Sequence, residues 1–195
     1  MDIVYQDERI VVAIKPAGVI STDVRNGMPE LLRRQLHTDC IRTVHRLDAP
    51  VSGLMVLARS SRAAAEISAQ IRDGAFSKAY LAVLRGVPQE MSGELIDLLG
   101  RDRERRMTYV ADAPGKGVQE ARLRYEVLAA RDGLSLVRVE LLTGRTHQIR
   151  VQFASRGLPL AGDRRYGSPG DLLSPIALWS AHLSFRHPET GAEMT

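Results

Sequence analysis

Runs of apolar residues predict strands in the first half of the chain. Residues 3–5 and 10–14 are two short apolar runs around a polar turn, and they predict a pair of neighbouring strands. Residues 54–58 hold no polar side chain and follow a Ser-Gly pair, which is typical of a buried strand. Residues 76–84 predict a further strand with Tyr80 near its middle.

Two helices are predicted between these strands. Pro29 suits the first turn of a helix, and leucines at helical spacing follow it. Ser60 or Ser61 suits the cap of a second helix, and Gly74 is its expected end. The apolar positions of the two helices are Leu31, Leu32 and Leu36 in the first and Ala64, Ile67 and Ile71 in the second.

The second half is predicted to be mostly strand. Residues 118–128 and 134–142 flank an Arg-Asp-Gly turn, which predicts a hairpin. Residues 176–185 predict a last strand. A polar stretch, residues 99–117, lies between the two halves of the chain.

The fold prediction also includes a third helix and a chain that no linker divides. Thr146 is expected to cap a helix over residues 147–153, with Gly157 as its terminator. No repeat and no clear linker divides the chain. Residues 1–195 are therefore predicted to form a single α+β domain around a mixed, largely antiparallel sheet.

The composition indicates the cellular compartment in which the protein works. The single cysteine, Cys40, excludes an internal disulfide and fits a reducing compartment. No apolar run is long enough to span a bilayer. We therefore expect a cytoplasmic protein without a membrane partner.

Arginine supplies nearly all of the positive charge. The formal net charge is +4, and only Lys15, Lys78 and Lys116 are lysines. Arginine binds phosphate bidentately and stacks on bases, which favours a polyanionic partner, although codon composition also trades lysine for arginine. The polar stretch 99–117 holds four of these residues, Arg101, Arg103, Arg105 and Arg106.

Asp48 is a candidate reactive acid. It lies beside His45 and Arg46 in a loop that leads into the predicted buried strand 54–58, so its carboxylate is presented from a rigid base. The alternative is an ion pair that fixes a turn, because paired charges are commonly structural. Tyr80 is either a packed sheet tyrosine or a ring that stacks on a base and relays a proton.

Two further segments carry concentrated donors. Arg145, His147, Gln148 and Arg150 lie at a predicted strand-to-helix junction, where cations oppose the helix dipole and so indicate a nearby anion. The alternative is a solvated helix N-terminus. Residues 160–167 form a basic turn with glycines near both ends, either a phosphate-contacting loop or a tight surface turn.

These segments occur in a recognisable order. The chain reads DERIVVAIKPAGV, HRLDAPVSG, KAYLAV, GRTHQIRVQFA and LAGDRRYG in turn. In this combination it resembles the RluA-type family of RNA pseudouridine synthases over residues 7–187. The resemblance implies the pseudouridine synthase catalytic fold, a curved sheet flanked by helices with a cleft between two lobes. It also implies that a uridine is detached from its ribose at N1 and reattached through C5.

The resemblance also implies roles for individual residues. Asp48 is similar to the family's catalytic aspartate, and Arg46 to the arginine that holds the RNA and the displaced base. Tyr80 is similar to the aromatic residue that stacks on the target base, and Arg150 to the arginine that pairs with the aspartate. His45, Arg145, His147 and Gln148 lie in the same two motifs and are expected to contact the RNA.

Two rival functions are weighed against this interpretation. A hydrolase would need a nucleophile elbow or a second positioned carboxylate, and neither is marked in the sequence. An RNA-binding protein without catalysis shares the charge but leaves Asp48, Tyr80 and Arg150 unexplained. No metal or organic cofactor is expected, because the isomerisation is redox-neutral and the histidines are scattered.

Some positions depart from the family pattern. Ala49, Pro50 and Val51 follow the aspartate where many relatives carry charged residues and a threonine. The chain begins almost at the first catalytic-domain strand, so no separate N-terminal RNA-binding domain is expected. Ribosomal or transfer RNA is the expected partner, with residues 99–117 as a basic finger.

Overall fold

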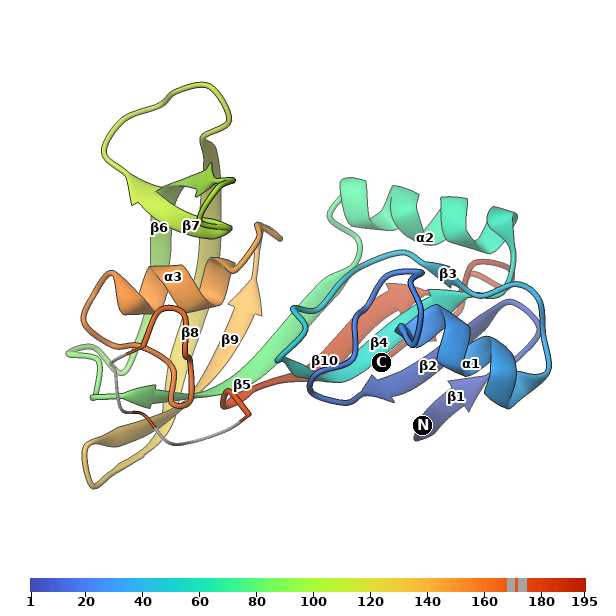
Figure 1. Ribbon diagram of the computed structural model, residues 1–195, viewed down its shortest axis with the longest axis horizontal. Coiled ribbons are helices and arrows are strands. Elements are labelled where there is room, and N and C mark those ends of the chain that lie inside the picture. Colours follow the sequence, from blue (N-terminus) through green and yellow to red (C-terminus); the bar gives the residue numbers. More distant parts are fainter. Residues whose placement is uncertain (168–170, 172–174) are drawn as a thin grey trace. The chain divides into compact units, whose positions relative to one another are not determined.

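The computed structural model describes residues 1–167, 171 and 175–195, and the chain divides into two compact units (Figure 1). Unit 1 comprises Met1–Lys78 and Trp179–Thr195, and unit 2 comprises Ala79–Leu178. The chain passes between the units within two strands, β5 (Ser77–Arg85) and β10 (Leu178–Arg186).

Unit 1 is built on a sheet in the order β1-β2-β4-β10. Its central strand β4 is antiparallel to β2 and parallel to β10, so the sheet is mixed. Gly53 is required where β4 meets β10, because a Cβ there would lie 2.4 Å from the carbonyl oxygen of Ser180. The strands are β1 (Ile3–Gln6), β2 (Ile10–Lys15), β3 (Arg42–Thr43, paired with β4), β4 (Ser52–Ala58) and β11 (Glu193–Met194, paired with β10).

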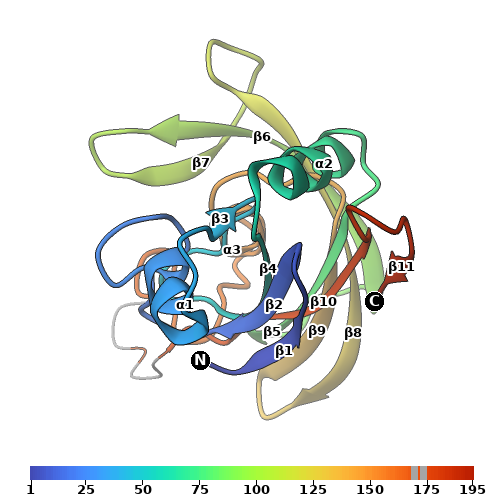
Figure 2. The same cartoon turned by 90° about the vertical axis from the view of Figure 1, so that its right-hand side faces the viewer.

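Both predicted helices of unit 1 are confirmed. Helix α1 (Met28–Leu36) begins with Pro29 in its first turn, and α2 (Ser61–Arg72) begins after Ser60, whose Oγ accepts from the Ala63 amide at 3.1 Å. Figure 2 shows α2 running beside β4. The sheet and α2 pack together through one buried apolar cluster, which includes Ile10, Val12, Val56, Ile67, Phe76, Leu183 and Phe185.

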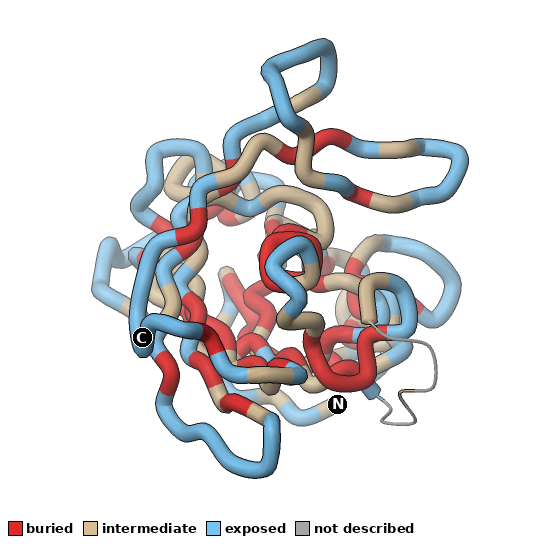
Figure 3. The backbone as a smooth tube through the Cα atoms, turned by 90° about the vertical axis from the view of Figure 1, so that its left-hand side faces the viewer, coloured by how far each residue is buried: buried red, intermediate tan, exposed pale blue. Residues whose placement is uncertain are grey.

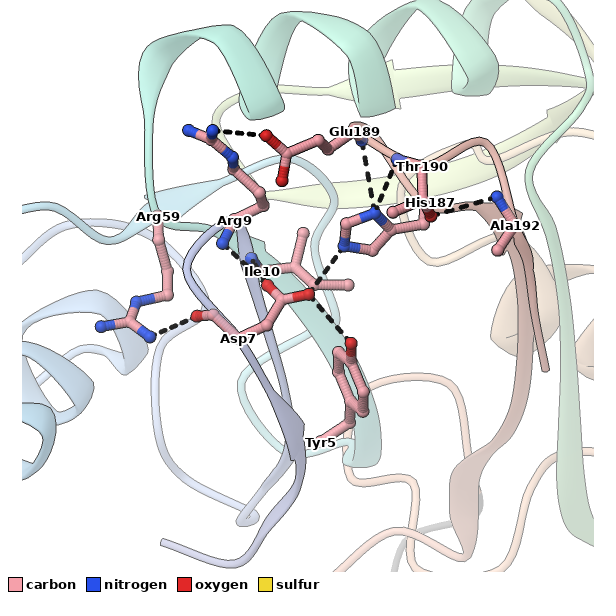
Figure 4. Close-up of polar contacts among 9 residues, drawn as sticks. All are labelled: Tyr5, Asp7, Arg9, Ile10, Arg59, His187, Glu189, Thr190 and Ala192. Carbon is pink, nitrogen blue, oxygen red and sulfur yellow. Dashed lines mark hydrogen bonds and ion pairs between the residues drawn. The ribbon is translucent and has the colours of Figure 1, made fainter.

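A polar cluster around Asp7 joins the β1–β2 turn to the turn after β10 (Figure 4). Asp7 Oδ1 accepts from the amides of Arg9 and Ile10, at 2.7 and 2.8 Å. Asp7 Oδ2 lies 2.7 Å from Nε2 of His187 and accepts from the Tyr5 hydroxyl at 2.9 Å. Two segments 180 residues apart are thereby held together by one carboxylate.

In its described residues, unit 2 has an antiparallel sheet in the order β5-β9-β8-β6-β7 and one helix. Its further elements are β6 (Ser92–Asp102), β7 (Met107–Ala111), β8 (Gln119–Arg131), β9 (Leu134–Leu141) and α3 (Gln148–Ala154). Asp132 and Gly133 both have positive φ, 52° and 74°, as a two-residue β8–β9 hairpin turn requires. Figure 3 shows burial concentrated along strands and α3, whereas hairpin tips are exposed.

One prediction for unit 2 is wrong, and one hairpin was not predicted. Thr146 does not cap α3, because His147 occupies the N-cap position with φ at +55°, and the Gln148 side chain accepts from the Arg145 amide instead. The polar stretch 99–117 has regular secondary structure. It contains the end of β6 and all of β7, which form an antiparallel hairpin from Leu98↔Ala111 to Asp102↔Met107.

The predicted fold class is confirmed: the chain is α+β, with mixed, mostly antiparallel strand pairing. No helix in the described part of the chain has both the length and the apolar character needed to cross a membrane.

Candidate active site

The loop that carries Asp48 is fixed from both sides. Its neighbours Leu47 and Val51 are buried, whereas Asp48 is half-buried and Arg46 is exposed. Ser21 Oγ donates to the Leu47 carbonyl at 2.7 Å and accepts from the Leu47 amide at 3.0 Å. The Val51 amide closes the turn on the Asp48 carbonyl at 3.0 Å. The carboxylate is therefore presented from a rigid turn, as the sequence predicted.

Lys15 supports this loop, and the sequence analysis missed its role. Its side chain is fully buried, and Nζ donates to the carbonyl oxygens of Pro16, Val19 and Ala49 at 2.9, 2.7 and 3.0 Å. Burial lowers the pKa of Lys15 to about 8, although attraction to the Asp48 charge opposes that shift. One ammonium group thus joins two loops beside Asp48. A lysine ending a buried strand was the available sequence signal.

His45 is buried in the core of unit 1, and the RNA contact expected for it stays a prediction. Its ring is buried against Phe76, with centroids 5.3 Å apart, and Nε2 accepts from the Val56 amide at 3.1 Å. Burial, with a smaller contribution from the charge of Lys78, lowers the pKa of His45 to about 3. The ring is therefore neutral at physiological pH, and it orients the loop relative to β4.

Arg150 is oriented by a buried ion pair within unit 2. Its Nε donates to Oδ2 of Asp163 at 2.8 Å, and its Nη2 donates to Oδ1 at 2.7 Å. Burial alone would raise the pKa of Asp163, but hydrogen bonds and charge from Arg150, with the amides of Arg165 and Tyr166, hold it below its usual value. The basic turn 160–167 thus supplies a carboxylate to Arg150, a contact that neither sequence interpretation included.

Gln148 and Arg145, from the same segment, form hydrogen bonds with neighbouring residues of unit 2. Gln148 is buried, and its Oε1 accepts from Thr143 Oγ1 at 2.8 Å and from the Arg145 amide at 2.9 Å. Its Nε2 donates to the Arg122 carbonyl at 3.0 Å, so Gln148 organises the turn, and the RNA contact expected for it stays a prediction. Arg145 is half-buried and donates from Nε to the Glu120 carbonyl at 2.9 Å.

Tyr80 lies on β5, directly opposite Val139 of β9, and is 4% exposed. The strand position agrees with the sequence prediction. The candidate residues therefore form two groups: Arg46 and Asp48 with the supporting Lys15 in unit 1, and Arg145, Gln148 and Arg150 with Tyr80 on a separate strand in unit 2.

The fold is that of a pseudouridine synthase. The human protein "RNA Pseudouridylate Synthase Domain Containing 1" matches with a TM-score of 0.86 and 27% identity, over 99% of this chain and 81% of its own. Residues 9–155 match the family model described as RNA pseudouridylate synthase. The chain therefore belongs to the RluA-type family of RNA pseudouridine synthases, which confirms the resemblance found in its motifs.

Curated relatives align along nearly the whole chain. YhcT of Bacillus subtilis, named as an uncharacterized RNA pseudouridine synthase, is 35% identical over 97% of this chain and 65% of its own length. The dual-specificity RNA pseudouridine synthase RluA of Salmonella typhimurium is 34% identical over 99% of this chain and 90% of its own. The chain spans 65–70% of the length of three relatives from Bacillus subtilis.

Proposed function

We propose that this chain isomerises a uridine of RNA to pseudouridine, with Asp48 as the catalytic carboxylate. The observation that carries the proposal is the rigid presentation of Asp48, between buried Leu47 and Val51 and beside the charge of Lys15, in a member of the pseudouridine synthase family. A reacting group must be held in a narrow geometry to be effective, and this loop meets that condition.

The reaction breaks the bond between N1 and C1′ and joins C5 to C1′. C5 releases its proton and N1 takes one up, so that the product is an isomer of uridine. Asp48 acts in its ionised form, by attack on C1′ or by removal of a sugar proton. Both routes need a uridine that has left its stack, which costs a few kcal/mol. Arginine contacts to the flanking phosphates offset this cost.

Arg150 and Tyr80 have supporting roles in the proposal. Asp163 holds the Nε and Nη2 edge of Arg150, and a guanidinium has five N–H donors, so the bound group still presents its charge in a fixed direction. By the family resemblance, this guanidinium is the proposed partner of the catalytic carboxylate. Tyr80 stacks on the target base, and such stacking stabilises the bound base by roughly 1–3 kcal/mol. Because the Tyr80 ring is buried, RNA binding must first expose it.

RNA is the proposed partner, held by Arg46 and by the β6–β7 hairpin. Arg46 and the four arginines of that hairpin are all exposed. Several relatives are named ribosomal large subunit pseudouridine synthase D, which supports ribosomal RNA as a substrate, with transfer RNA as the second choice. Both occur in the cytoplasm, where we propose that the protein works.

The test compares Asp48→Asn with the original chain on transcripts of ribosomal and transfer RNA that carry C5-tritiated uridine. We expect Asp48→Asn to release no tritium while binding RNA nearly as tightly. Asp39→Asn, at an exposed position of the same unit, is the matched control and should stay active. Nucleoside mass spectrometry with a pseudouridine-specific label identifies the product.

Three outcomes would contradict the proposal. Full tritium release by Asp48→Asn would exclude this carboxylate. Binding without pseudouridine in the original chain would leave an RNA-binding protein of the same fold without catalysis. Release of free uracil would indicate a hydrolase.

A further inference from the structure

Tyr166 lies where three segments of unit 2 meet. Its hydroxyl is 2.7 Å from Nδ1 of His147 and accepts from the amide of Thr108 at 2.8 Å. Its ring lies beneath the guanidinium of Arg150, whose Cζ is 5.1 Å from the ring centroid. The side chain therefore touches β7, the residue before α3 and Arg150 at once.

Only one of these hydrogen bonds has a direction fixed by its donor. The Thr108 amide only donates, so the Tyr166 oxygen accepts there, whereas its bond with Nδ1 of His147 runs in the direction that the tautomer of that ring sets. His147 has φ at +55°, a backbone conformation that is uncommon for residues other than glycine. The contact to Tyr166 thus supports a strained residue immediately before α3.

The same contacts fix the β6–β7 hairpin. Among the described residues β7 pairs with β6 alone, so the outer edge of β7 has no neighbouring strand. Contacts other than strand pairing must hold this edge of the hairpin. Thr108 is buried and donates from Oγ1 to the Thr146 carbonyl at 3.0 Å, and Arg165 donates to the Arg106 carbonyl. The Tyr166 ring also packs against the apolar cluster of Leu99, Ala121 and Val151.

We propose that Tyr166 is a positioning residue that couples the basic β6–β7 hairpin to Arg150. The inference rests on the proposed function. It adds that RNA binding at the hairpin helps to hold the guanidinium of Arg150 in place. Phosphates held by the hairpin arginines fix β7, Thr108 fixes the Tyr166 hydroxyl, and the ring with Asp163 fixes the guanidinium of Arg150. The ring covers one flat face of the guanidinium, and Asp163 holds one edge.

Two variants separate the hydroxyl from the ring. Tyr166→Phe removes both hydroxyl contacts and keeps the ring under Arg150, whereas Tyr166→Leu also removes the ring. The matched control is Tyr125→Phe, in the same unit, whose hydroxyl donates to the Glu90 carbonyl away from Arg150. The full chain is assayed for RNA affinity and single-turnover rate on transcripts of ribosomal and transfer RNA with C5-tritiated uridine.

The expected results differ in kind between the two variants. Tyr166→Phe should weaken RNA binding by about fivefold or more, since the loss of a single hydrogen bond has about this effect and the variant loses two, while the rate constant stays nearly unchanged. Tyr166→Leu should in addition lower the rate constant roughly tenfold, because the stacked cation loses its ring. Tyr125→Phe should match the original chain. The Thr108 amide should exchange faster with solvent in Tyr166→Phe.

A double variant provides the coupling test. If the hydroxyl acts through the hairpin, Tyr166→Phe should have no further effect on affinity once the four hairpin arginines are alanine. Additive effects in this cycle, or original affinity in Tyr166→Phe, would overturn the inference. Absence of pseudouridine in the original chain would overturn the proposed function instead, and the affinity cycle still decides the coupling. If Tyr166→Leu does not fold, Tyr166→Phe and the cycle decide alone.

Discussion

Arg150 and Asp163 form a buried two-pronged ion pair, with side chains only 6% and 0% exposed. Both oxygens of the carboxylate accept from the guanidinium, at 2.8 and 2.7 Å. Two charges that have lost their water are tolerated only in such geometry, because each would otherwise be left uncompensated in a medium of low dielectric constant. Helix α3 therefore sets the backbone position of Arg150, and Asp163 sets the position of its guanidinium group.

Asp163→Asn should lower both stability and activity. The variant removes the carboxylate charge from a buried ion pair, so the free energy of unfolding should fall by about 3–5 kcal/mol in urea titrations. Because the pKa of Asp163 in the folded chain is below the ordinary 3.8, its contribution is present above that pH and is lost as pH falls further. The stability deficit of the variant should therefore shrink in acid.

The control for this prediction is an exposed ion pair of the same unit. Glu94 pairs with Arg122, and these side chains are 27% and 44% exposed. Glu94→Gln should change the free energy of unfolding by less than about 1 kcal/mol, as surface pairs usually do. Equal losses in Asp163→Asn and Glu94→Gln would show that burial of the Arg150 pair has no special consequence.

Lys15→Met should impair catalysis more than folding. The substitution removes three hydrogen bonds that join the two loops beside Asp48, but it also removes the cost of burying a charge, so the two effects on stability partly cancel. Displacement of a reacting group by about 1 Å lowers rates on the order of a hundredfold. Single-turnover tritium release measures the loss.

The exposed Lys116 provides the comparison. Lys116→Met should keep the original rate constant and melting temperature. If Lys15→Met also kept the original rate constant, the ammonium group would have no part in positioning Asp48.

His45→Gln should remove part of the acid sensitivity of the fold. Burial lowers the pKa of His45 from 6.5 to about 3, so between these values the unfolded chain binds a proton that the folded chain does not. Stability is therefore lost as pH falls from 6.5 towards 3, by up to about 4–5 kcal/mol. Glutamine can still accept from the Val56 amide and does not titrate.

Urea titrations at pH 7 and in mild acid measure this difference. The free energy of unfolding of His45→Gln should vary less between the two conditions than that of the original chain. Identical acid dependence in both proteins would show that another group controls it.

The β6–β7 hairpin should contribute to RNA affinity through charge. Replacing its four arginines by alanine should weaken binding and reduce the dependence of log K on log salt concentration, by roughly 0.7–0.9 for each phosphate that is no longer bound. The rate constant at saturating RNA should change less than the affinity. The substituted residues are Arg101, Arg103, Arg105 and Arg106, all exposed.

Three exposed arginines elsewhere in unit 2 provide a matched set: Arg124, Arg131 and Arg138. Alanine at these positions should cost less affinity per charge removed, because only the hairpin is proposed to contact RNA. Equal losses per charge would indicate that net charge alone, rather than the hairpin, governs binding.

Elements with a strong local signal could be predicted from the sequence. The buried strand that became β4, the Ser60 cap and the Asp132-Gly133 hairpin were found because each depends on residues a few positions apart. The β6–β7 hairpin was missed because its residues 101–106 are mostly charged and exposed, so no apolar period marks it. Thr146 was a plausible cap, but a backbone turn at His147 decided where α3 begins.

The family, the strand that supports the Asp48 loop and the residue types at the candidate positions all follow from the amino-acid order. Which of these residues are supports depends on the folded chain. Lys15 meets Ala49 across 34 residues, Arg150 meets Asp163 across 13, and Tyr166 meets Thr108 across 58. The internal contacts of His45 with Val56 and of Gln148 with Arg122 were likewise not predictable from the sequence. Periodicity reports which face of an element is apolar, whereas the partner of a buried polar group depends on distant segments that only folding brings together.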